Sequence, residues 1–220
     1  MKVVLIGVAG GSGSGKTWLA HELERRLWPH AAILSLDDFY ADVSYLSMAE
    51  RSALNFDAPG AIDWSLLQRS LEGIVRGEAV WLPKYDFATH TRQSRRRRWR
   101  PRPVVLLEGL WPWRRPQLRR MYTLKVFRTG TEEIRLARRL ARDVAQRERS
   151  EASVQQQWRR QVQPMYARYV RPQLRSADIT VPAEAPEWRL ARLTRKIATV
   201  AGLALDKSDA ASFTPPSQRG

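Results

Sequence analysis

The sequence predicts an α/β protein in which helices cover both faces of a parallel β-sheet. Three observations support this fold class. Five short apolar runs of the length of buried strands are spread along the chain. Segments with a helical pattern lie between most of them. The first run leads through a glycine-rich loop directly into a helix, and 220 residues are enough for one domain with a substantial core.

The expected elements follow in chain order. The apolar runs predict strands at residues 2–8, 31–36, 104–110, 123–127 and 177–181. Helical patterns predict helices at residues 16–28, 131–149, 153–170 and 187–203. Three tryptophans fall at helix positions where packing is their commoner role, namely Trp18, Trp64 and Trp158.

Residues 80–92, VWLPKYDFATHTR, interrupt the alternation with aromatic and β-branched residues, and we expect a β-hairpin there. The domain organisation that we predict is a single domain over 1–205, with a hairpin lobe at about 79–103 and an Arg-rich lid at about 138–157. The segment 206–220 has no apolar pattern and is expected to be a disordered tail.

Composition narrows the classes of protein. There is no cysteine, which excludes disulfides and thiolate metal ligands and favours the cytoplasm. No apolar run approaches the ~20 residues that span a bilayer, so we expect a soluble protein without a membrane partner. The net charge of +16 suggests anionic ligands, either nucleic acid or small phosphorylated molecules. Nucleic acid is the less favoured partner, because the densest basic run, RRRRWR at 95–100, fits a solvated loop.

The loop GGSGSGKT fits the pattern G-x-x-x-x-G-K-[ST], after an expected strand and before an expected helix. Glycines let successive backbone N–H groups converge on phosphate oxygens, and the helix N-terminus adds positive potential. Lys16 would reach the outer phosphates, and the Thr17 hydroxyl would ligate Mg²⁺. The predicted nucleotide-binding residues are therefore Gly10, Gly11, Ser12, Gly13, Ser14, Gly15, Lys16 and Thr17.

Carboxylates follow two of the expected strands. Asp37 and Asp38 come after the second strand, and Glu108 lies near the end of the third. In a parallel sheet these ends meet at the edge that carries the phosphate-binding loop. An aspartate there would take the proton of an acceptor hydroxyl, and a carboxylate near the metal is the other part that phosphoryl transfer needs.

Motifs along the chain resemble those of the uridine kinases (uridine-cytidine kinases), P-loop nucleoside kinases. LDDFY, NFDAPGAIDW, LPKYDFATHTR, VVLLEGL, RRLARDVAQRER, VQQQW and ADITVP occur in the family's order between residues 3 and 182. The resemblance implies a P-loop kinase that transfers the γ-phosphate of ATP or GTP to the 5′-hydroxyl of uridine or cytidine with Mg²⁺, as in pyrimidine salvage. It also suggests a homotetramer built partly through the hairpin lobe.

The resemblance also assigns roles to residues. Asp37 matches the general base, and Thr17 with Glu108 matches the Mg²⁺ site, beside which Asp37 is a further candidate ligand. The residues that match substrate contacts are Asp57, Arg139 and Gln157 for the ribose, and Tyr85, His90 and Arg149 for the base. Mobile lid arginines can neutralise a triphosphate in the transition state, so Arg142 and Arg147 are the expected phosphate clamp. We expect Arg135 and Arg138 to lie on a solvated helix face.

The chain departs from the family at four places. Asp38 replaces a serine, Ala58 replaces a histidine, and Gly60 replaces a bulkier acidic residue. The segment RTGT at 128–131 lacks the acidic residues that relatives carry after the fourth strand. Alternative hypotheses are a kinase for nicotinamide riboside, pantothenate or ribulose 5-phosphate, a nucleic-acid-binding P-loop ATPase, and a catalytically silent P-loop protein.

Overall fold

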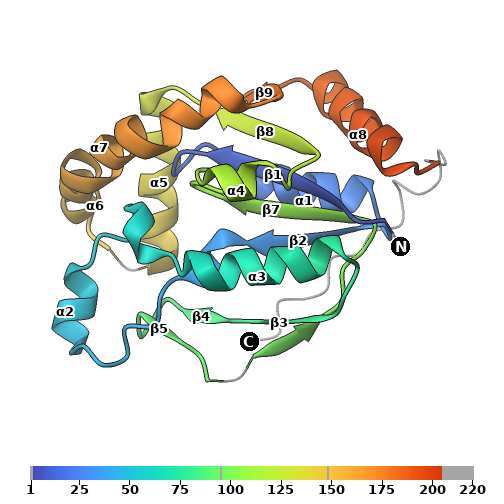
Figure 1. Cartoon of the computed structure of the whole chain (residues 1–220). Coiled ribbons are helices and arrows are strands. Elements are labelled where there is room, and N and C mark those ends of the chain that lie inside the picture. The colour runs from blue at the N-terminus through green and yellow to red at the C-terminus, as the bar shows by residue number, and fades with distance from the viewer. Residues whose placement is uncertain (1, 95, 148, 205–220) are drawn as a thin grey trace.

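The computed structural model describes residues 2–94, 96–147 and 149–204. The predicted tail at 206–220 lies outside the described residues, and so does the side chain of Arg147. The strands are β1 Val4–Gly10, β2 Ala31–Ser35, β3 Val80–Leu82, β4 Tyr85–Asp86, β5 Thr91–Arg92, β6 Arg97–Trp99, β7 Val104–Gly109, β8 Leu124–Thr129 and β9 Ile179–Pro182. The α-helices are α1 Lys16–Arg26, α2 Met48–Ala53, α3 Trp64–Val75, α4 Pro116–Arg119, α5 Glu132–Arg147, α6 Glu151–Gln157, α7 Gln163–Met165 and α8 Glu187–Ala201 (Figure 1).

The central sheet confirms the predicted fold class. Its five strands are all parallel in the order β2-β7-β1-β8-β9. The chain passes from β7 on one side of β1 to β8 on the other, so the carboxyl end of β1 lies at the point where the strand order reverses. Open α/β sheets bind their ligands at such a switch point. In Figure 1 the strands run toward the end of the molecule where α2, α5 and α6 gather.

Successive side chains of β1 point to opposite faces of the sheet, so this strand contributes to the core on both sides. Val4, Ile6 and Val8 pack with residues of α1 and α8 in one core cluster. Leu5 and Ala9 face the other cluster, which contains buried residues of α3. Both faces are therefore covered by helices, as the continuous apolar strands require. The sequence analysis placed Trp64 in a helix but gave no range for α3, although its apolar spacing is helical and Asp63 caps its first turn by accepting from the Leu66 N–H.

The lobe is built differently from the expected single hairpin. β4 and β5 form a short antiparallel pair within residues 80–92, as expected. β3 instead pairs with β6, so that Val80 lies opposite Trp99. Arg97 and Arg98 of the basic run are exposed but belong to strand β6 of the lobe, so the expectation of a loop at this place is wrong. Figure 1 shows the lobe strands β3, β4 and β5 next to α3.

The segment expected as one helix at 153–170 is helical throughout but irregular. After α6 the turns at 158–162 and 166–170 widen to π-helical hydrogen bonding, with α7 between them. Pro164 has no N–H to donate, which explains a break in the regular α-helical pattern at this point. In the described part of the chain, no helix is long and apolar enough to cross a membrane.

Two side chains differ from the sequence-based expectation. Arg135 is buried, with 2% of its surface exposed, rather than solvated. Its guanidinium stacks on the Tyr166 ring, 3.7 Å from the ring centre, and its Nη2 donates to Gln163 Oε1. Trp18 is 53% exposed, whereas Trp64 and Trp158 are packed as expected.

Candidate active site

The glycine-rich loop joins β1 to α1 in a conformation that needs its glycines. Gly13 and Gly15 have φ angles of 77° and 82°, in the left-handed region that favours glycine. A Cβ atom on Gly13 would lie 2.0 Å from the Arg135 carbonyl oxygen. The loop is thus held against the first turns of α5. The predicted residues run from Gly10, the last residue of β1, to Lys16 and Thr17, which begin α1.

Glu108 links the loop to the end of β2. Its carboxylate is 5% exposed and accepts hydrogen bonds from Thr17 Oγ1 at 3.1 Å and from Ser35 Oγ at 3.0 Å. Burial raises the pKa of Glu108, and the charge of Lys16 opposes this rise. Because Thr17 directs its proton at Glu108, the lone pairs of its hydroxyl oxygen are left for a cation. Sequence reasoning missed Ser35, whose signal was a hydroxyl two residues before Asp37.

Asp37 lies in the same cluster as Lys16 and Glu108. Its backbone N–H donates to Ser35 Oγ, which fixes the start of the 3₁₀ turn Leu36–Phe39. The charge of Asp37 raises the pKa of Glu108, after the larger effects of burial and Lys16. Asp37 is therefore within electrostatic reach of the loop, as predicted from the strand ends.

The oxygen donors suit Mg²⁺ but do not form a complete protein site. The described residues contain no group of three or more His, Cys, Asp or Glu side chains placed to hold a metal. The Thr17 hydroxyl and the Glu108 carboxylate lie together at the loop. Mg²⁺ is usually bound by one or two protein oxygens together with substrate phosphates and waters. The arrangement fits an ion that arrives with a triphosphate.

Asp57 faces the same centre from the loop after α2. Burial raises the pKa of Asp57, the charge of Arg139 opposes the rise, and Asp37 adds to it. Lys16 also lowers the pKa of Asp57. Residues far apart in sequence thus place two carboxylates and two cations within mutual electrostatic reach. The arrangement brings the predicted ribose-binding carboxylate to the predicted base.

An aromatic cluster adjoins these carboxylates. The His90 ring stacks on Phe56 at 5.0 Å with an interplanar angle of 14°. Tyr85 packs against Tyr40 and Phe87 with ring centres 5.1 and 5.3 Å apart. Tyr85 is 4% exposed, and its hydroxyl has no hydrogen-bond partner among the described residues. Phe56 lies between the two predicted base-reading residues, with its ring centre 6.1 Å from that of Tyr85 and 5.0 Å from that of His90, so both belong to one aromatic wall.

The lid residues form a connected polar network. Arg139 Nη1 donates to Ser12 Oγ of the loop at 2.8 Å, and its Nη2 donates to Gln157 Oε1 at 2.8 Å. Arg149 Nη1 donates to the same Gln157 oxygen at 2.5 Å. Three of the predicted substrate-binding residues are thus together, and Ser12 connects them to the phosphate-binding loop.

Asp143 organises this network and was missed by sequence reasoning. Its carboxylate is fully buried and lies 3.3 Å from Arg139 Nε and 4.0 Å from Arg149 Nη1. Arg142, one of the predicted clamp residues, donates its Nε to Asp143 Oδ1 at 2.8 Å. The available signal was the position of Asp143, four residues after Arg139, where the two side chains share a helix face.

The carboxylate of Asp38 is partly buried near that of Asp37, and this is expected to lower the stability of the fold. Burial raises the pKa of Asp38, the charge of Arg97 opposes this rise, and the charge of Asp37 adds to it. An acid whose pKa is raised by folding destabilises the fold once it ionises, so stability is lost as the pH rises through the folded pKa. We therefore expect Asp38→Asn to raise the melting temperature at pH 7, and this gain should shrink as the pH falls toward about 4, the pKa of an aspartate in the unfolded chain.

Thermal melts of both proteins across this pH range check the prediction. Glu184→Gln is a matched control, because it removes one negative charge from the protein outside this cluster. An unchanged or lower melting temperature of Asp38→Asn at pH 7 would show that Arg97 outweighs the burial of Asp38.

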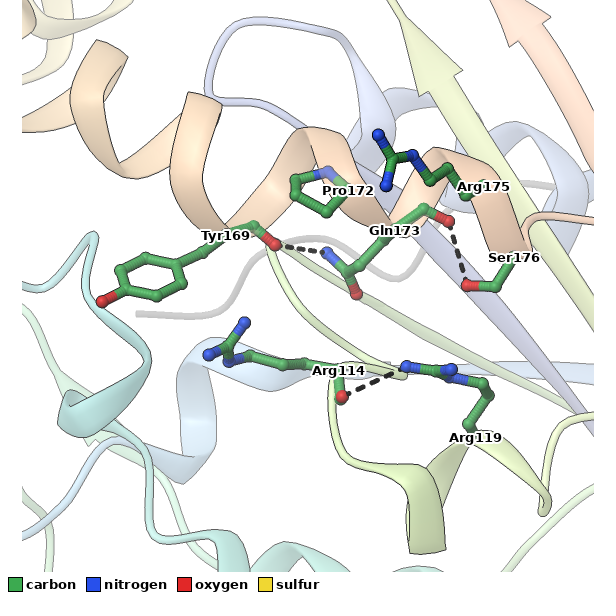
Figure 2. Close-up of a pocket in the computed structure, with 7 residues that line it drawn as sticks. All are labelled: Arg114, Arg119, Tyr169, Pro172, Gln173, Arg175 and Ser176. Carbon is green, nitrogen blue, oxygen red and sulfur yellow. Dashed lines mark hydrogen bonds between the residues drawn. The ribbon is translucent and has the colours of Figure 1, made fainter.

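Two further pockets lie outside the carboxylate cluster. One of about 360 Å³ lies between the end of β8 and the segment after β9, with Thr129, Ile134, Pro182 and Glu184 in its lining. The other, of about 370 Å³, is shown in Figure 2 and contains no predicted site residue. There the Arg114 guanidinium stacks 4.5 Å from the Tyr169 ring centre.

The chain is similar in sequence to known proteins over most of its length. A model of the phosphoribulokinase / uridine kinase family matches residues 5–187. The uridine kinase of Chloroflexus aggregans is 42% identical over 180 residues, which cover 81% of this chain and 86% of that protein. The uridine kinase of Lactobacillus johnsonii is 41% identical over 201 residues, covering 90% and 95%.

Solved structures share the fold at lower identity. Phosphoribulokinase from Rhodobacter spheroides matches with a TM-score of 0.63 and 18% identity, over 82% of this chain and 70% of that one. D-glycerate 3-kinase from Cryptococcus neoformans matches with a TM-score of 0.53 and 21% identity, over 75% and 78%.

Proposed function

Because this chain belongs to the phosphoribulokinase / uridine kinase family, we propose that it phosphorylates the 5′-hydroxyl of uridine or cytidine with ATP or GTP as the donor and Mg²⁺ as the metal ion. The observation that carries the choice of acceptor is the wall formed by Tyr85 and His90 beside Asp57. Pyrimidine salvage, a cytoplasmic location and a homotetramer belong to the same proposal.

The acceptor wall suits a nucleoside. A pyrimidine ring offers a flat face for aromatic packing and a polar edge for hydrogen bonds. The buried Tyr85 hydroxyl lacks a partner among the described residues, and such a group costs free energy unless a ligand or water satisfies it. Asp57 provides two carboxylate oxygens that can accept from both ribose hydroxyls. These features support a ribonucleoside over a smaller acceptor without a ring.

The proposed chemistry assigns one task to each group. Asp37 accepts the proton of the 5′-hydroxyl as its oxygen attacks the γ-phosphorus, and the bond from that phosphorus to the bridging oxygen of the donor breaks. Lys16 holds the outer phosphates during the transfer. Mg²⁺ bound at Thr17 and Glu108 would neutralise charge on the phosphate oxygens. The family-implied ribose contacts are Arg139 and Gln157, and the base contact is Arg149.

The lid arginines complete the proposal. Arg142 is held by Asp143 in this structure, with 38% of its side chain exposed. Closure of the lid over a bound triphosphate would let Arg142 exchange that pairing for phosphate oxygens, which gain charge in the transition state. Arg147 is the second clamp residue of the proposal.

A product assay tests the proposed function. Purified protein is incubated with Mg-ATP or Mg-GTP and a panel of uridine, cytidine, adenosine, nicotinamide riboside, pantothenate and ribulose 5-phosphate, and products are identified by mass. Uridine or cytidine monophosphate is the expected product. A product from another acceptor would refute the pyrimidine assignment, and hydrolysis stimulated by nucleic acid without any phosphorylated acceptor would favour the P-loop ATPase.

The acceptor wall makes a separate prediction. His90→Ala removes the ring that stacks on Phe56, and we expect it to raise the KM for the pyrimidine nucleoside several-fold, about as much as the loss of one aromatic contact, while the KM for ATP changes little. Initial-rate kinetics with each substrate varied in turn measure both constants. Thr89→Ala, on the same exposed turn, is the control. Equal changes in both KM values would remove His90 from the acceptor site.

A further inference from the structure

Arg128 and Arg138 bring two positive charges to the same side of the phosphate-binding loop. Arg128 lies in β8 beside Gly10 of β1, and its Nη2 donates to the Ala183 carbonyl at 2.8 Å. Arg138 of α5 directs its own Nη2 at the same oxygen, at 3.5 Å. A Cβ atom placed on Gly15 would lie 3.4 Å from Arg138 Nη1 and 3.9 Å from Arg128 Nε. Both guanidinium groups therefore reach the turn from which α1 begins.

The Arg128 side chain lacks the partners that a buried cation needs. It is 3% exposed, and its Nε and Nη1 have no hydrogen-bond partner among the described residues. Burial, and after it the positive charge of Arg138, lower the pKa of Arg128 to about 10. A buried charge without a partner is costly, whereas an anion at this place would satisfy both unpaired N–H groups.

The positions of Arg128 and Arg138 indicate which phosphate of a bound triphosphate would lie next to them. Lys16, Thr17 and Glu108 mark the side of the loop where the transferred phosphate and its metal ion belong. Arg128 instead lies beside Gly15 and Trp18, and its guanidinium is 5.3 Å from the centre of the Trp18 ring. The pocket between the end of β8 and the segment after β9 is lined by Thr129, which follows Arg128 in the chain, and by Ala183, whose carbonyl accepts from Arg128. The nucleoside end of the donor is therefore the end nearest Arg128.

We propose that Arg128 and Arg138 bind the α-phosphate of the nucleoside triphosphate donor, as an additional anion site beside the phosphate-binding loop. This inference rests on the proposed function only in requiring a triphosphate donor. The proposal also explains the segment RTGT at 128–131. Its arginine, Arg128, lies near the end of β8, and the segment lacks acidic residues. A carboxylate there would pair with Arg128 and compete with the phosphate.

Calorimetric titration with Mg-ATP and with inorganic tripolyphosphate tests the proposal. Tripolyphosphate has the charges of the donor but no nucleoside. We expect Arg128→Gln to weaken both ligands by the same factor, about 10- to 100-fold, because each loses hydrogen bonds from a charged donor. Arg128→Lys keeps the charge without the planar fork and should recover part of the loss. Arg138→Gln, at an exposed residue, provides the same comparison if the Arg128 variants do not fold.

The outcomes separate the alternatives. A loss confined to ATP would overturn the proposal, because the contact would then be with the base or ribose. Unchanged binding of both ligands would also overturn it and leave the pair as a structural contact to Ala183. Arg192→Gln on α8 controls for the loss of one positive charge and should change neither affinity more than slightly. Wild-type protein that binds both ligands but phosphorylates no nucleoside would refute the proposed function alone.

Discussion

Asp37→Asn is expected to lower the turnover of uridine or cytidine by ~10²-fold or more while leaving ATP affinity nearly unchanged. An amide cannot accept the proton of the attacking hydroxyl, yet it occupies almost the same volume. The backbone N–H that anchors this residue to Ser35 Oγ is kept in the variant, so its turn should keep its geometry. Initial rates at saturating substrate give the turnover number, and calorimetric titration gives the affinity for Mg-ATP.

Asp38→Asn is a closely matched control for this experiment, because the same change is made at the neighbouring residue in the same 3₁₀ turn. We expect its turnover to stay within a few-fold of wild type, the usual range when no proton-transfer group is lost. Comparable losses in both variants would mean that the turn, and not the base, had been damaged. Near-normal turnover of Asp37→Asn would remove Asp37 from the mechanism.

The parallel sheet was predictable because each of its strands has a recognisable pattern within its own short segment of sequence. A strand buried on both faces is a continuous apolar run, and Val4, Val104 and Leu124 begin three such runs at places close to those expected. The order of the strands was not predictable in this way. It depends on which side of β1 each crossover packs, and this is decided by tertiary contacts such as those of α1, the crossover between β1 and β2, with β2 and β7.

The lobe shows why pairing is harder to predict than strand position. Trp81 and Arg98 are partners across β3 and β6, yet a prolyl residue and the β4–β5 pair lie between them in sequence. Local turn signals favoured the nearest hairpin, whereas the structure closes a second pair around it. Only the inner pair, with Tyr85 opposite Arg92, is visible from the local pattern.

The candidate site was predictable where chemistry requires one residue type at one place. Phosphate binding requires a lysine and a hydroxyl residue directly after the glycines, which here are Lys16 and Thr17. Glu108, near the end of β7, accepts from the Thr17 hydroxyl. The supporting residues Ser35 and Asp143 were missed, because a hydroxyl or a helical acid is common in any sequence. Their roles appear only when the fold brings them against Glu108 and Arg139.

Glu108→Gln is expected to raise the Mg²⁺ concentration for half-maximal activity and to lower turnover, each by about 10- to 100-fold, as is typical when a group that orients a metal site is lost. Thr17 and Ser35 donate to different oxygens of the carboxylate, and the amide replaces one of these oxygens with an NH₂ donor, so one of the two hydroxyls loses its acceptor. The negative charge facing Lys16 is also removed. Mg²⁺ titrations of initial rate at fixed ATP measure the effect.

The pH dependence of this variant separates charge from shape. Burial raises the pKa of Glu108, so the wild-type carboxylate loses its charge at a higher pH than an exposed glutamate as the solution is acidified. Because the charged form holds the metal, the Mg²⁺ requirement of the wild-type enzyme should increase toward acidic pH, and this increase should be absent in Glu108→Gln. Ser35→Ala removes one hydrogen bond but keeps the charge, so it should retain the pH dependence with a smaller loss of activity. If Glu108→Gln has the Mg²⁺ requirement of wild type throughout the pH range, the metal is held by other oxygens, and Glu108 serves only to orient the Thr17 hydroxyl.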